Sequence, residues 1–209
     1  MKGIIFDLDG VLLSTDEFHY MAWKELADGL NIPFDRNKNN RLRGISRMAS
    51  LEIVLEGYDF SQEQKIAFAE EKNNTYRNLL STLTPETVSS DVRFTINKLK
   101  DNGYKLAIGS SSKNTKFILE KTCLIDMFDA IADGNDITHS KPDPEVFLKA
   151  AEKLGLKPCE CVVVEDAEAG IDAGNAGGFT TVGIGDASKY VKAKCKIDKL
   201  SDILNIPIL

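Results

Sequence analysis

The sequence GIIFDLDG, residues 3–10, joins a short apolar run to two aspartates, Asp7 and Asp9. An apolar run of this length, bounded by polar residues, is typical of a strand that is buried on both faces of a parallel sheet. Residues two apart on an extended chain point to the same side, so both carboxylates can face one ligand. We therefore expect a parallel sheet whose first strand ends in a pair of acids.

Strand and helix patterns alternate after residue 92. Apolar runs predict strands at 105–109, 130–132, 161–164 and 180–184, and the segments between them predict helices at 92–100, 114–120, 144–154 and 167–176. We expect residues 200–206 to form a last short helix and strand. This alternation predicts right-handed βαβ units, and hence an α/β fold with a doubly wound parallel sheet.

The segment 16–82 interrupts that alternation after the first strand. Its helical patterns lie at 16–30, 47–56 and 61–80, a polar, turn-rich stretch lies at 31–40, and no convincing strand is present. We therefore expect a small α-helical cap domain at 16–82. It is inserted into a Rossmann-like catalytic core formed by 1–15 and 83–209.

Two helix starts in this segment carry capping signals. Ser61 with Gln64 resembles a capping box, in which each side chain bonds the main chain of the other. Thr15 or Asp16 could cap the helix that begins near residue 16.

Composition limits the possible partners. The chain has 209 residues, 43% of them hydrophobic, a net charge of −6 and a pI near 5.1, which argues against nucleic acid as a partner. The apolar N-terminal run is broken by aspartates, so we expect neither a signal peptide nor a membrane span. The scattered cysteines predict reduced thiols. We expect a cytoplasmic monomer, because no long amphipathic seam stands out.

The ends of the expected strands carry reactive groups, and ligands of an open parallel sheet bind beyond these carboxyl ends. Four acids around one crevice repel one another unless a cation lies between them, and magnesium is the natural choice. A hydroxyl and an ammonium would suit a phosphate. The groups are Asp7, Asp9, Ser110, Ser111, Ser112, Lys141, Glu165 and Asp166.

Each of these groups also has an ordinary interpretation. Taken alone, Asp7 and Asp9 would be a solvated turn, residues 110–112 a polar loop, Lys141 a surface lysine, and Glu165 with Asp166 the cap of the following helix. The occurrence of all of them at strand ends favours the chemical interpretation. A carboxylate can attack phosphorus, and a second acid can move the proton of the leaving or accepting oxygen.

Four motifs resemble the haloacid dehalogenase superfamily, in the same order along the chain. They are FDLDGVLLST (6–15), GSSS (109–112), SKPDPEVF (140–147) and VVVEDAEAGIDAG (162–174). The resemblance implies that Asp7 is the nucleophile and Asp9 the general acid and base. It implies that Ser110 and Lys141 bind phosphate. It also implies a Mg²⁺ ion held by Asp7, the main-chain carbonyl of Asp9, and Asp166, with Glu165 nearby.

A narrower resemblance, to the beta-phosphoglucomutases, lies in HYMAWKELA (19–27), RLRGISRMASLEIVL (41–55), KNNTY (72–76) and SSSKN (110–114). That family usually has lysine where this chain has Arg43, and often alanine where it has Ser111. The resemblance implies a cap that closes over the core and contacts the sugar phosphate. The implied contact residues are His19, Trp23, Arg43, Gly44, Arg47, Ser50, Lys72, Asn73 and Asn114, with Ser111 and Ser112 in the core.

The resemblance implies conversion of beta-glucose 1-phosphate to glucose 6-phosphate, through a phosphorylated Asp7 and glucose 1,6-bisphosphate. We expect Arg47 to hold the non-reacting phosphate, and hinges near Thr15 and residues 80–84. His19 is either a polar residue between domains or a group that handles closure or protons, and Trp23 is more often packing than a ligand contact. The alternatives are a magnesium-dependent sugar-phosphate phosphatase on the same scaffold and a non-catalytic binding protein.

Overall fold

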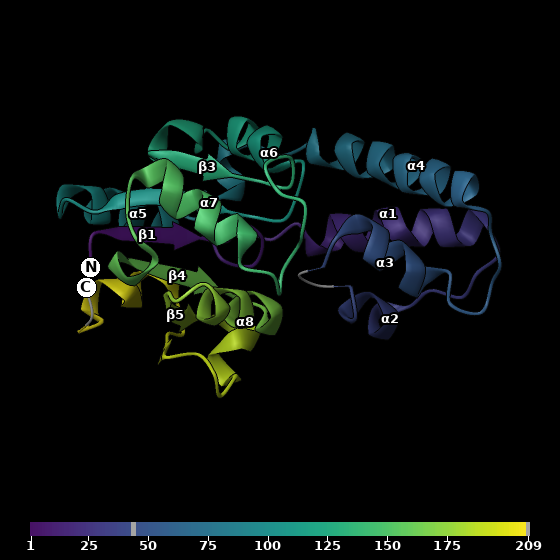
Figure 1. Ribbon diagram of the computed structural model, residues 1–209. Helices are drawn as coiled ribbons and strands as arrows, with labels where there is room; N and C mark the ends of the chain where they lie inside the picture. Colours follow the sequence, from purple (N-terminus) through teal and green to yellow (C-terminus); the bar gives the residue numbers. More distant parts are fainter. Residues whose placement is uncertain (43–44, 208–209) are drawn as a thin grey trace. The chain divides into compact units, whose positions relative to one another are not determined.

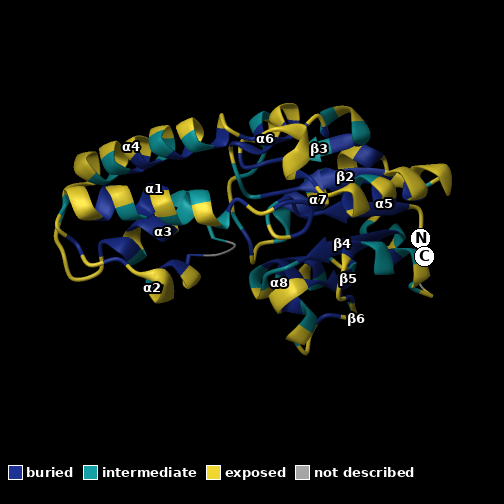
Figure 2. Cartoon of the chain, turned by 180° about the vertical axis from the view of Figure 1, so that it is seen from behind, coloured by how far each residue is buried: buried dark blue, intermediate teal, exposed yellow. Residues whose placement is uncertain are grey.

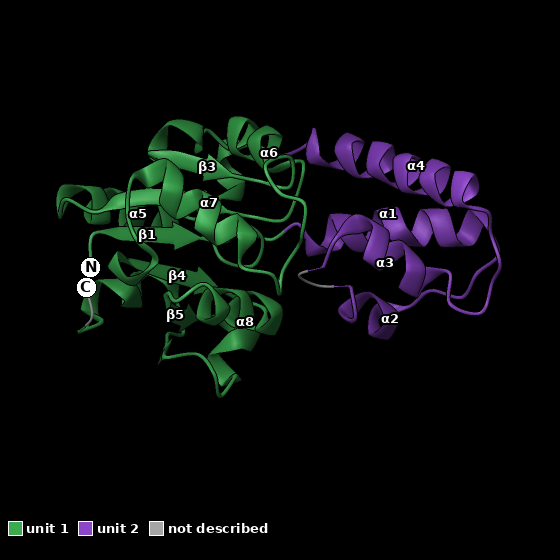
Figure 3. Ribbon diagram, in the orientation of Figure 1, with its two compact units in different colours: residues 1–14, 84–209 green, residues 15–83 purple. Residues whose placement is uncertain are grey.

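The computed structural model describes residues 1–42 and 45–207 of the chain (Figure 1). Arg43 and Gly44, both predicted sugar-phosphate contacts, lie outside the described residues. The chain divides into two compact units, one formed by residues 1–14 with 84–209 and the other by residues 15–83 (Figure 3). These boundaries lie one residue from those expected for the core and the cap.

The larger unit contains a parallel sheet, with six strands among the described residues, in the order β3-β2-β1-β4-β5-β6. The predicted doubly wound α/β fold is confirmed. Because β1 and β4 are central, both of their faces are covered, and their residues read as continuous apolar runs. The strands are β1 (Gly3–Phe6), β2 (Lys105–Gly109), β3 (Ala130–Ala132), β4 (Cys161–Glu165), β5 (Thr180–Gly183) and β6 (Cys195–Lys196).

The pleat of the sheet divides its apolar side chains between two layers. Ile5, Ala107 and Val163 lie in one core cluster with Phe147 and Ala150 of helix α7, which packs on β1, β2 and β3. The helices of this unit are α5 (Ser90–Asp101), α6 (Thr115–Lys121), α7 (Glu145–Leu154) and α8 (Glu168–Ala176). Exposed and buried residues alternate along α5 and α8 in Figure 2. This layered core holds the strand ends in fixed positions.

The C-terminal segment differs from the prediction. Residues Leu200–Asn205 form a 3₁₀ helix, and no strand follows it within the described residues; the last strand, β6, lies earlier, at Cys195–Lys196. β6 has only two residues and lies in the charged sequence KAKCKID, so it has no apolar run that periodicity could detect. Pairing with β5, a tertiary contact, makes it a strand.

The smaller unit is helical, as predicted, and α1 packs along α4. Trp23, Leu26, Leu51 and Val54 belong to its core cluster. Its helices are α1 (Asp16–Gly29), α2 (Arg36–Asn40), α3 (Arg47–Val54) and α4 (Gln62–Leu80). The short helix α2 was not predicted, because its sequence RNKNN has no apolar stripe.

The helix starts confirm one capping prediction and correct another. At α4 the Ser61 hydroxyl accepts the Gln64 N–H at 3.2 Å, and the Gln64 side chain accepts the Ser61 N–H at 2.9 Å. At α1, Thr15 occupies the cap position but makes no capping bond, since its hydroxyl is 2.8 Å from the Tyr76 hydroxyl in a buried pair. Within the described part of the chain, no helix is both long and apolar enough to cross a membrane.

Candidate active site

At the carboxyl ends of β1 and β4, Asp7 and Glu165 meet Lys141, which lies in the segment between β3 and α7. Asp7 extends β1, and its N–H donates to the Val164 carbonyl at 2.9 Å. The Lys141 ammonium donates to Asp7 Oδ1 and to Glu165 Oε1, each at 2.5 Å. All three residues are buried, with Lys141 only 4% exposed. Buried charges are costly unless they are paired, so this ion-pair network holds Lys141 beside the predicted nucleophile.

Both carboxylate oxygens of Glu165 accept hydrogen bonds from the protein, which the sequence did not predict. One of its carboxylate oxygens accepts the Lys141 ammonium, and the other accepts the Ala167 N–H at 2.8 Å. The structure thus pairs Glu165 with Lys141 and with the main chain of Ala167, and its predicted role as a metal ligand stays a prediction. Asp166, the residue directly after β4, is the second candidate ligand at this strand end.

The electrostatics of this centre show an excess of negative charge. Burial raises the pKa of Asp7 to about 7; Lys141 opposes this increase, while Glu165 and Asp9 add to it. Burial, followed by the carboxylates of Glu165, Asp7 and Asp9, raises the pKa of Asp166 to about 8. Burial alone would lower the pKa of Lys141, but Asp7 and Glu165 raise it above its ordinary value. One lysine therefore does not neutralise the centre.

Gly10 lets the main chain after β1 approach Asp166. Its φ is +84°, and a Cβ atom there would overlap the Asp166 carboxylate. Among the described residues, no group of three or more His, Cys, Asp or Glu side chains is arranged to hold a metal ion alone. Carboxylate and main-chain oxygens are the donors that a hard divalent cation prefers, and the unneutralised charge fits such a cation. The carboxylates of Asp7 and Asp166 fit a magnesium site in which main-chain and phosphate oxygens supply the remaining ligands.

The loop after β2 presents the predicted phosphate-binding serines. Ser110 is buried; its N–H donates to the Ala132 carbonyl at 3.1 Å, and its hydroxyl accepts the Ser112 N–H at 3.3 Å. The Ser112 hydroxyl accepts the Asn114 N–H at 3.2 Å. Ser111 Oγ is buried and has no hydrogen-bond partner among the described residues. An unsatisfied hydroxyl of this kind fits a site that an oxygen-rich ligand completes.

The helical unit contains a second cluster, around Lys72. The Lys72 ammonium is 2.9 Å from His19 Nδ1 and lies 4.7 Å and 4.5 Å from the ring centroids of Trp23 and Tyr76. The His19 ring stacks on Tyr76 at 4.1 Å between centroids. Lys72 is only 2% exposed, so its charge is held by these rings and by the imidazole.

His19 is an acceptor in this cluster. Burial, followed by the charges of Lys72 and Arg47, holds the pKa of His19 well below 6.5. The imidazole is therefore neutral, and because an ammonium has only donors, Nδ1 accepts and Nε2 carries the proton. Burial also lowers the pKa of Arg47, although Tyr76 and Glu70 oppose this decrease. The charges of two cationic side chains, Lys72 and Arg47, thus add to burial in keeping the His19 imidazole neutral.

Sequence reasoning missed Tyr76. It singled out His19, Trp23 and Lys72, which the structure brings together, but not the tyrosine that contacts two of them. The signal was present in the motif KNNTY, because residues four apart on a helix share one face, as Lys72 and Tyr76 do on α4.

The remaining candidates are placed by main-chain structure. Asp9 lies in a short parallel bridge with Leu13, and Asn114 is the buried residue that precedes α6. Arg47 is the first residue of α3, after the capping Ser46. The roles of these residues in binding and catalysis stay predictions.

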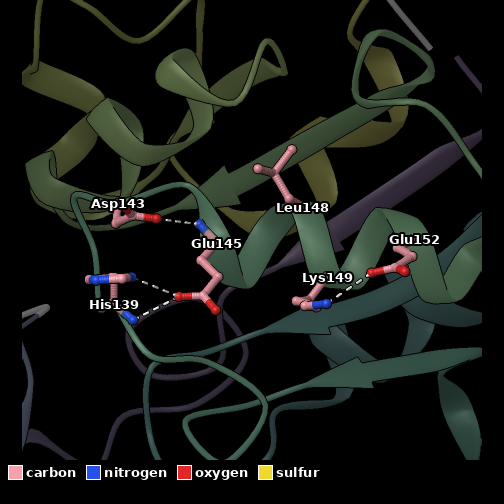
Figure 4. A pocket seen from close by; sticks show the side chains of 6 residues that line it. All are labelled: His139, Asp143, Glu145, Leu148, Lys149 and Glu152. Carbon is pink, nitrogen blue, oxygen red and sulfur yellow. Dashed lines mark hydrogen bonds and ion pairs between the residues drawn. The ribbon is translucent and has the colours of Figure 1, made fainter.

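A surface hollow of about 320 Å³ lies beside the start of α7 and contains none of the predicted site residues (Figure 4). In it, Glu145 Oε2 accepts the N–H groups of Thr138 and His139, at 3.0 and 2.7 Å, and the Glu145 N–H donates to Asp143 Oδ1 at 2.9 Å. These bonds hold the chain on both sides of Lys141. The hollow is lined by His139, Asp143, Glu145, Leu148, Lys149 and Glu152.

The comparisons agree with this geometry. Residues 1–178 match the family model of haloacid dehalogenase-like hydrolases. The chain belongs to this family. The predicted family membership is therefore confirmed, as is the fold that the family implies.

Several relatives within the family cover almost the whole chain. A beta-phosphoglucomutase of Bacillus subtilis (strain 168) is 40% identical over 207 residues, which are 97% of this chain and 92% of the relative. The fructose-1-phosphate phosphatase YqaB of Escherichia coli (strain K12) is 31% identical over 87% of this chain and 95% of its own. A crystal structure of a beta-phosphoglucomutase from Clostridium difficile superposes with a TM-score of 0.91 and 39% identity, over 97% and 93% of the two chains.

Proposed function

We propose that this protein is a beta-phosphoglucomutase, an intramolecular phosphotransferase. It interconverts beta-D-glucose 1-phosphate and glucose 6-phosphate through a phosphorylated Asp7 and glucose 1,6-bisphosphate. The observation that carries the proposal is the second cationic cluster. In it the Lys72 ammonium contacts the buried His19, and burial, followed by the charges of Lys72 and Arg47, lowers the pKa of His19. A mutase must hold a phosphate that is not reacting as well as the one that is. The similarity to the Bacillus subtilis and Clostridium difficile mutases supports the same assignment.

The first cluster supports the phosphoryl transfer itself. In the first step, the 6-hydroxyl of the sugar attacks the phosphorus on Asp7, and Asp9 takes the hydroxyl proton while the bond to the Asp7 oxygen breaks. After the bisphosphate reorients, Asp7 attacks the phosphorus of the 1-phosphate, and Asp9 returns the proton to the departing sugar oxygen. Lys141, at 2.5 Å from Asp7, would stabilise the charge on the transferring group in both steps.

Magnesium is part of the proposal. Asp7, Asp166 and the main-chain carbonyl of Asp9 would hold the ion. Burial, with the neighbouring carboxylates adding to it, raises the pKa of Asp7 and of Asp166, and a cation at this place would offset both effects. When bound, magnesium would supply positive charge against the phosphoryl oxygens. Ser110 and the loop that follows it would hold the same phosphoryl group through hydroxyl and N–H donors.

The distal phosphate would bind to Arg47, with Lys72 and His19 supporting it. Arginine is suited to this role because its planar fork matches phosphate oxygens in either orientation of the sugar. His19, neutral and protonated on Nε2, offers an N–H donor without adding charge. A phosphatase has no need to hold a second phosphate while the substrate turns round.

The test is a paired assay of purified protein with magnesium, beta-glucose 1-phosphate and a trace of glucose 1,6-bisphosphate, in which glucose 6-phosphate and free phosphate are followed together. Glucose 6-phosphate formed well above free phosphate is the expected result. Free phosphate without isomerised sugar would replace the mutase by the sugar-phosphate phosphatase, the activity named for the Escherichia coli relative. Asp7→Asn is the matched control and should form neither product.

A further inference from the structure

The turn after β3, Asp133–Asp136, was not among the predicted site residues, yet it lies directly against the serine loop. The Ser110 N–H donates to the Ala132 carbonyl at 3.1 Å, and the Gly134 N–H donates to the Ser112 carbonyl at 3.2 Å. The Asn135 side chain donates to the Lys113 carbonyl at 3.2 Å. Three hydrogen bonds therefore join the loop to the end of β3 and to this turn.

The turn is itself held firmly. The Asp133 side chain is fully buried, and its Oδ1 accepts from the Asn135 main-chain N–H at 2.8 Å and from the Asn135 side chain at 3.0 Å. The Asp133 N–H donates to Asp136 Oδ2 at 2.9 Å, and Asp136 is paired with Lys153 at 2.9 Å. A turn with this many internal bonds can act as a fixed support.

Gly134 is the point of closest approach between the turn and the loop. A Cβ atom on Gly134 would overlap the Ser111 carbonyl oxygen and would lie 2.9 Å from the Lys113 nitrogen. Both are main-chain atoms, which cannot swing aside as the end of a side chain can. Any side chain at this position must therefore move the loop or the turn.

We propose that Gly134 is a positioning residue for phosphate binding, which acts by letting the serine loop rest on the turn after β3. The inference rests on the proposed role of Ser110 and its loop in holding the reacting phosphate. The inference adds Gly134 as the residue that fixes the position of the N–H and hydroxyl donors of the serine loop. A methyl group at Gly134 displaces Ser111 and, with it, the neighbouring N–H and hydroxyl groups of Ser110 and Ser112.

The experiment compares Gly134→Ala with Gly29→Ala. Gly29 lies at the end of α1, where an added Cβ would meet no atom within 4 Å, so it controls for the substitution itself. Binding of inorganic phosphate in the presence of magnesium is measured by phosphorus nuclear magnetic resonance titration. The KM and kcat for hydrolysis of p-nitrophenyl phosphate and the melting temperature are measured beside it. Phosphate binding is independent of any sugar, so a failure of the mutase proposal would leave this comparison intact.

We expect Gly134→Ala to raise the phosphate Kd and the KM by roughly 10- to 100-fold, because small misplacements of binding groups have effects of that size. Gly29→Ala should leave both unchanged. If Gly134→Ala does not fold, Asn135→Ala decides, since it keeps the glycine but removes the bond to the Lys113 carbonyl; a rise in Kd of about threefold or more is expected. Unchanged phosphate affinity in a folded Gly134→Ala or Asn135→Ala, or no phosphate binding by the unmodified protein, would overturn the inference.

Discussion

At the scale of single residues, the proposed functional groups of this protein are buried charges held by specific partners. Lys141 lies between two carboxylates, and Lys72 lies between two aromatic rings and a neutral imidazole. Burial makes each of these groups sensitive to the loss of a partner, because water cannot replace it. The effects of substitution should therefore differ sharply between buried pairs and surface pairs.

Replacement of Lys141 by methionine should lower both stability and activity. It leaves the Asp7 and Glu165 carboxylates buried without their cation, which should cost about 3–5 kcal/mol of unfolding free energy. Phosphoryl transfer should fall by at least about a hundredfold. Urea unfolding and the paired sugar-phosphate assay measure the two effects. Lys2→Met, which breaks the exposed pair with Glu160, is the control; equal losses in both variants would contradict this account.

His19 should make the protein less stable in mild acid. Its pKa is held well below 6.5 in the folded protein, by burial and then by Lys72 and Arg47, whereas the unfolded chain takes up a proton near pH 6.5. The unfolded state thus binds more protons below that pH, so stability should fall as the pH decreases from 6.5, by at most about 1.4 kcal/mol per pH unit.

The measurement is urea unfolding at pH 7.5 and pH 5, and His19→Gln should lose the part of the pH dependence that His19 causes. His139→Gln is the matched control, because the His139 side chain is 70% exposed. A pH dependence that His19→Gln leaves unchanged would show that other groups cause it.

At the scale of elements, most helices and strands follow from local patterns. The strands β1, β2, β4 and β5 were predicted because buried parallel strands are continuous apolar runs. The helix α2 and the strand β6 were not predicted, because a five-residue polar helix and a two-residue edge strand leave no periodic signal. Contacts with the rest of the fold decide whether such short segments become regular.

The capping box of α4 gives a prediction at this scale. Ser61→Ala removes the bond that the Ser61 hydroxyl accepts from the Gln64 N–H, so the helical unit should lose about 1 kcal/mol of stability. Urea unfolding followed by far-ultraviolet circular dichroism measures the loss. Ser81→Ala, at the other end of α4, is the control and should have a smaller effect. The assignment is wrong if the two substitutions are equivalent.

At the scale of the whole molecule, the proposed reaction draws on both compact units. The Asp7–Lys141–Glu165 network lies in the unit with the sheet, and the cluster around Lys72 lies in the helical unit. A nucleophile with a single phosphate site would be enough for hydrolysis of a sugar phosphate. Only a second phosphate site explains why an intermediate with two phosphates is retained and used again.

Arg47→Ala should therefore separate the two activities. It should lower mutase kcat/KM by roughly 10- to 100-fold, the equivalent of one charge-assisted hydrogen bond, while slow hydrolysis of phospho-Asp7 changes little. Arg41→Ala, which breaks an exposed pair with Glu56 in the same unit, is the matched control. Equal losses of mutase activity and hydrolysis would refute the assignment of the distal phosphate to Arg47.

The sequence alone determined the fold class, the family and the identity of the groups at the strand ends. The family follows from the resemblance of four motifs. The fold class and the meeting of these groups follow because buried parallel strands have a simple pattern and because their carboxyl ends meet at one edge of the sheet. Asp7, Lys141 and Glu165 were therefore predicted to be neighbours although 134 residues separate the first two.

Only the tertiary structure decided how those groups are paired. In the folded protein Glu165 accepts a hydrogen bond from Lys141. Tyr76 contacts both Lys72 and His19. Gly134 lies against the serine loop. Partners, exposure and pKa depend on distances between segments that are far apart in the chain. No local pattern contains those distances, because they arise when the sheet and the helices pack into their layers.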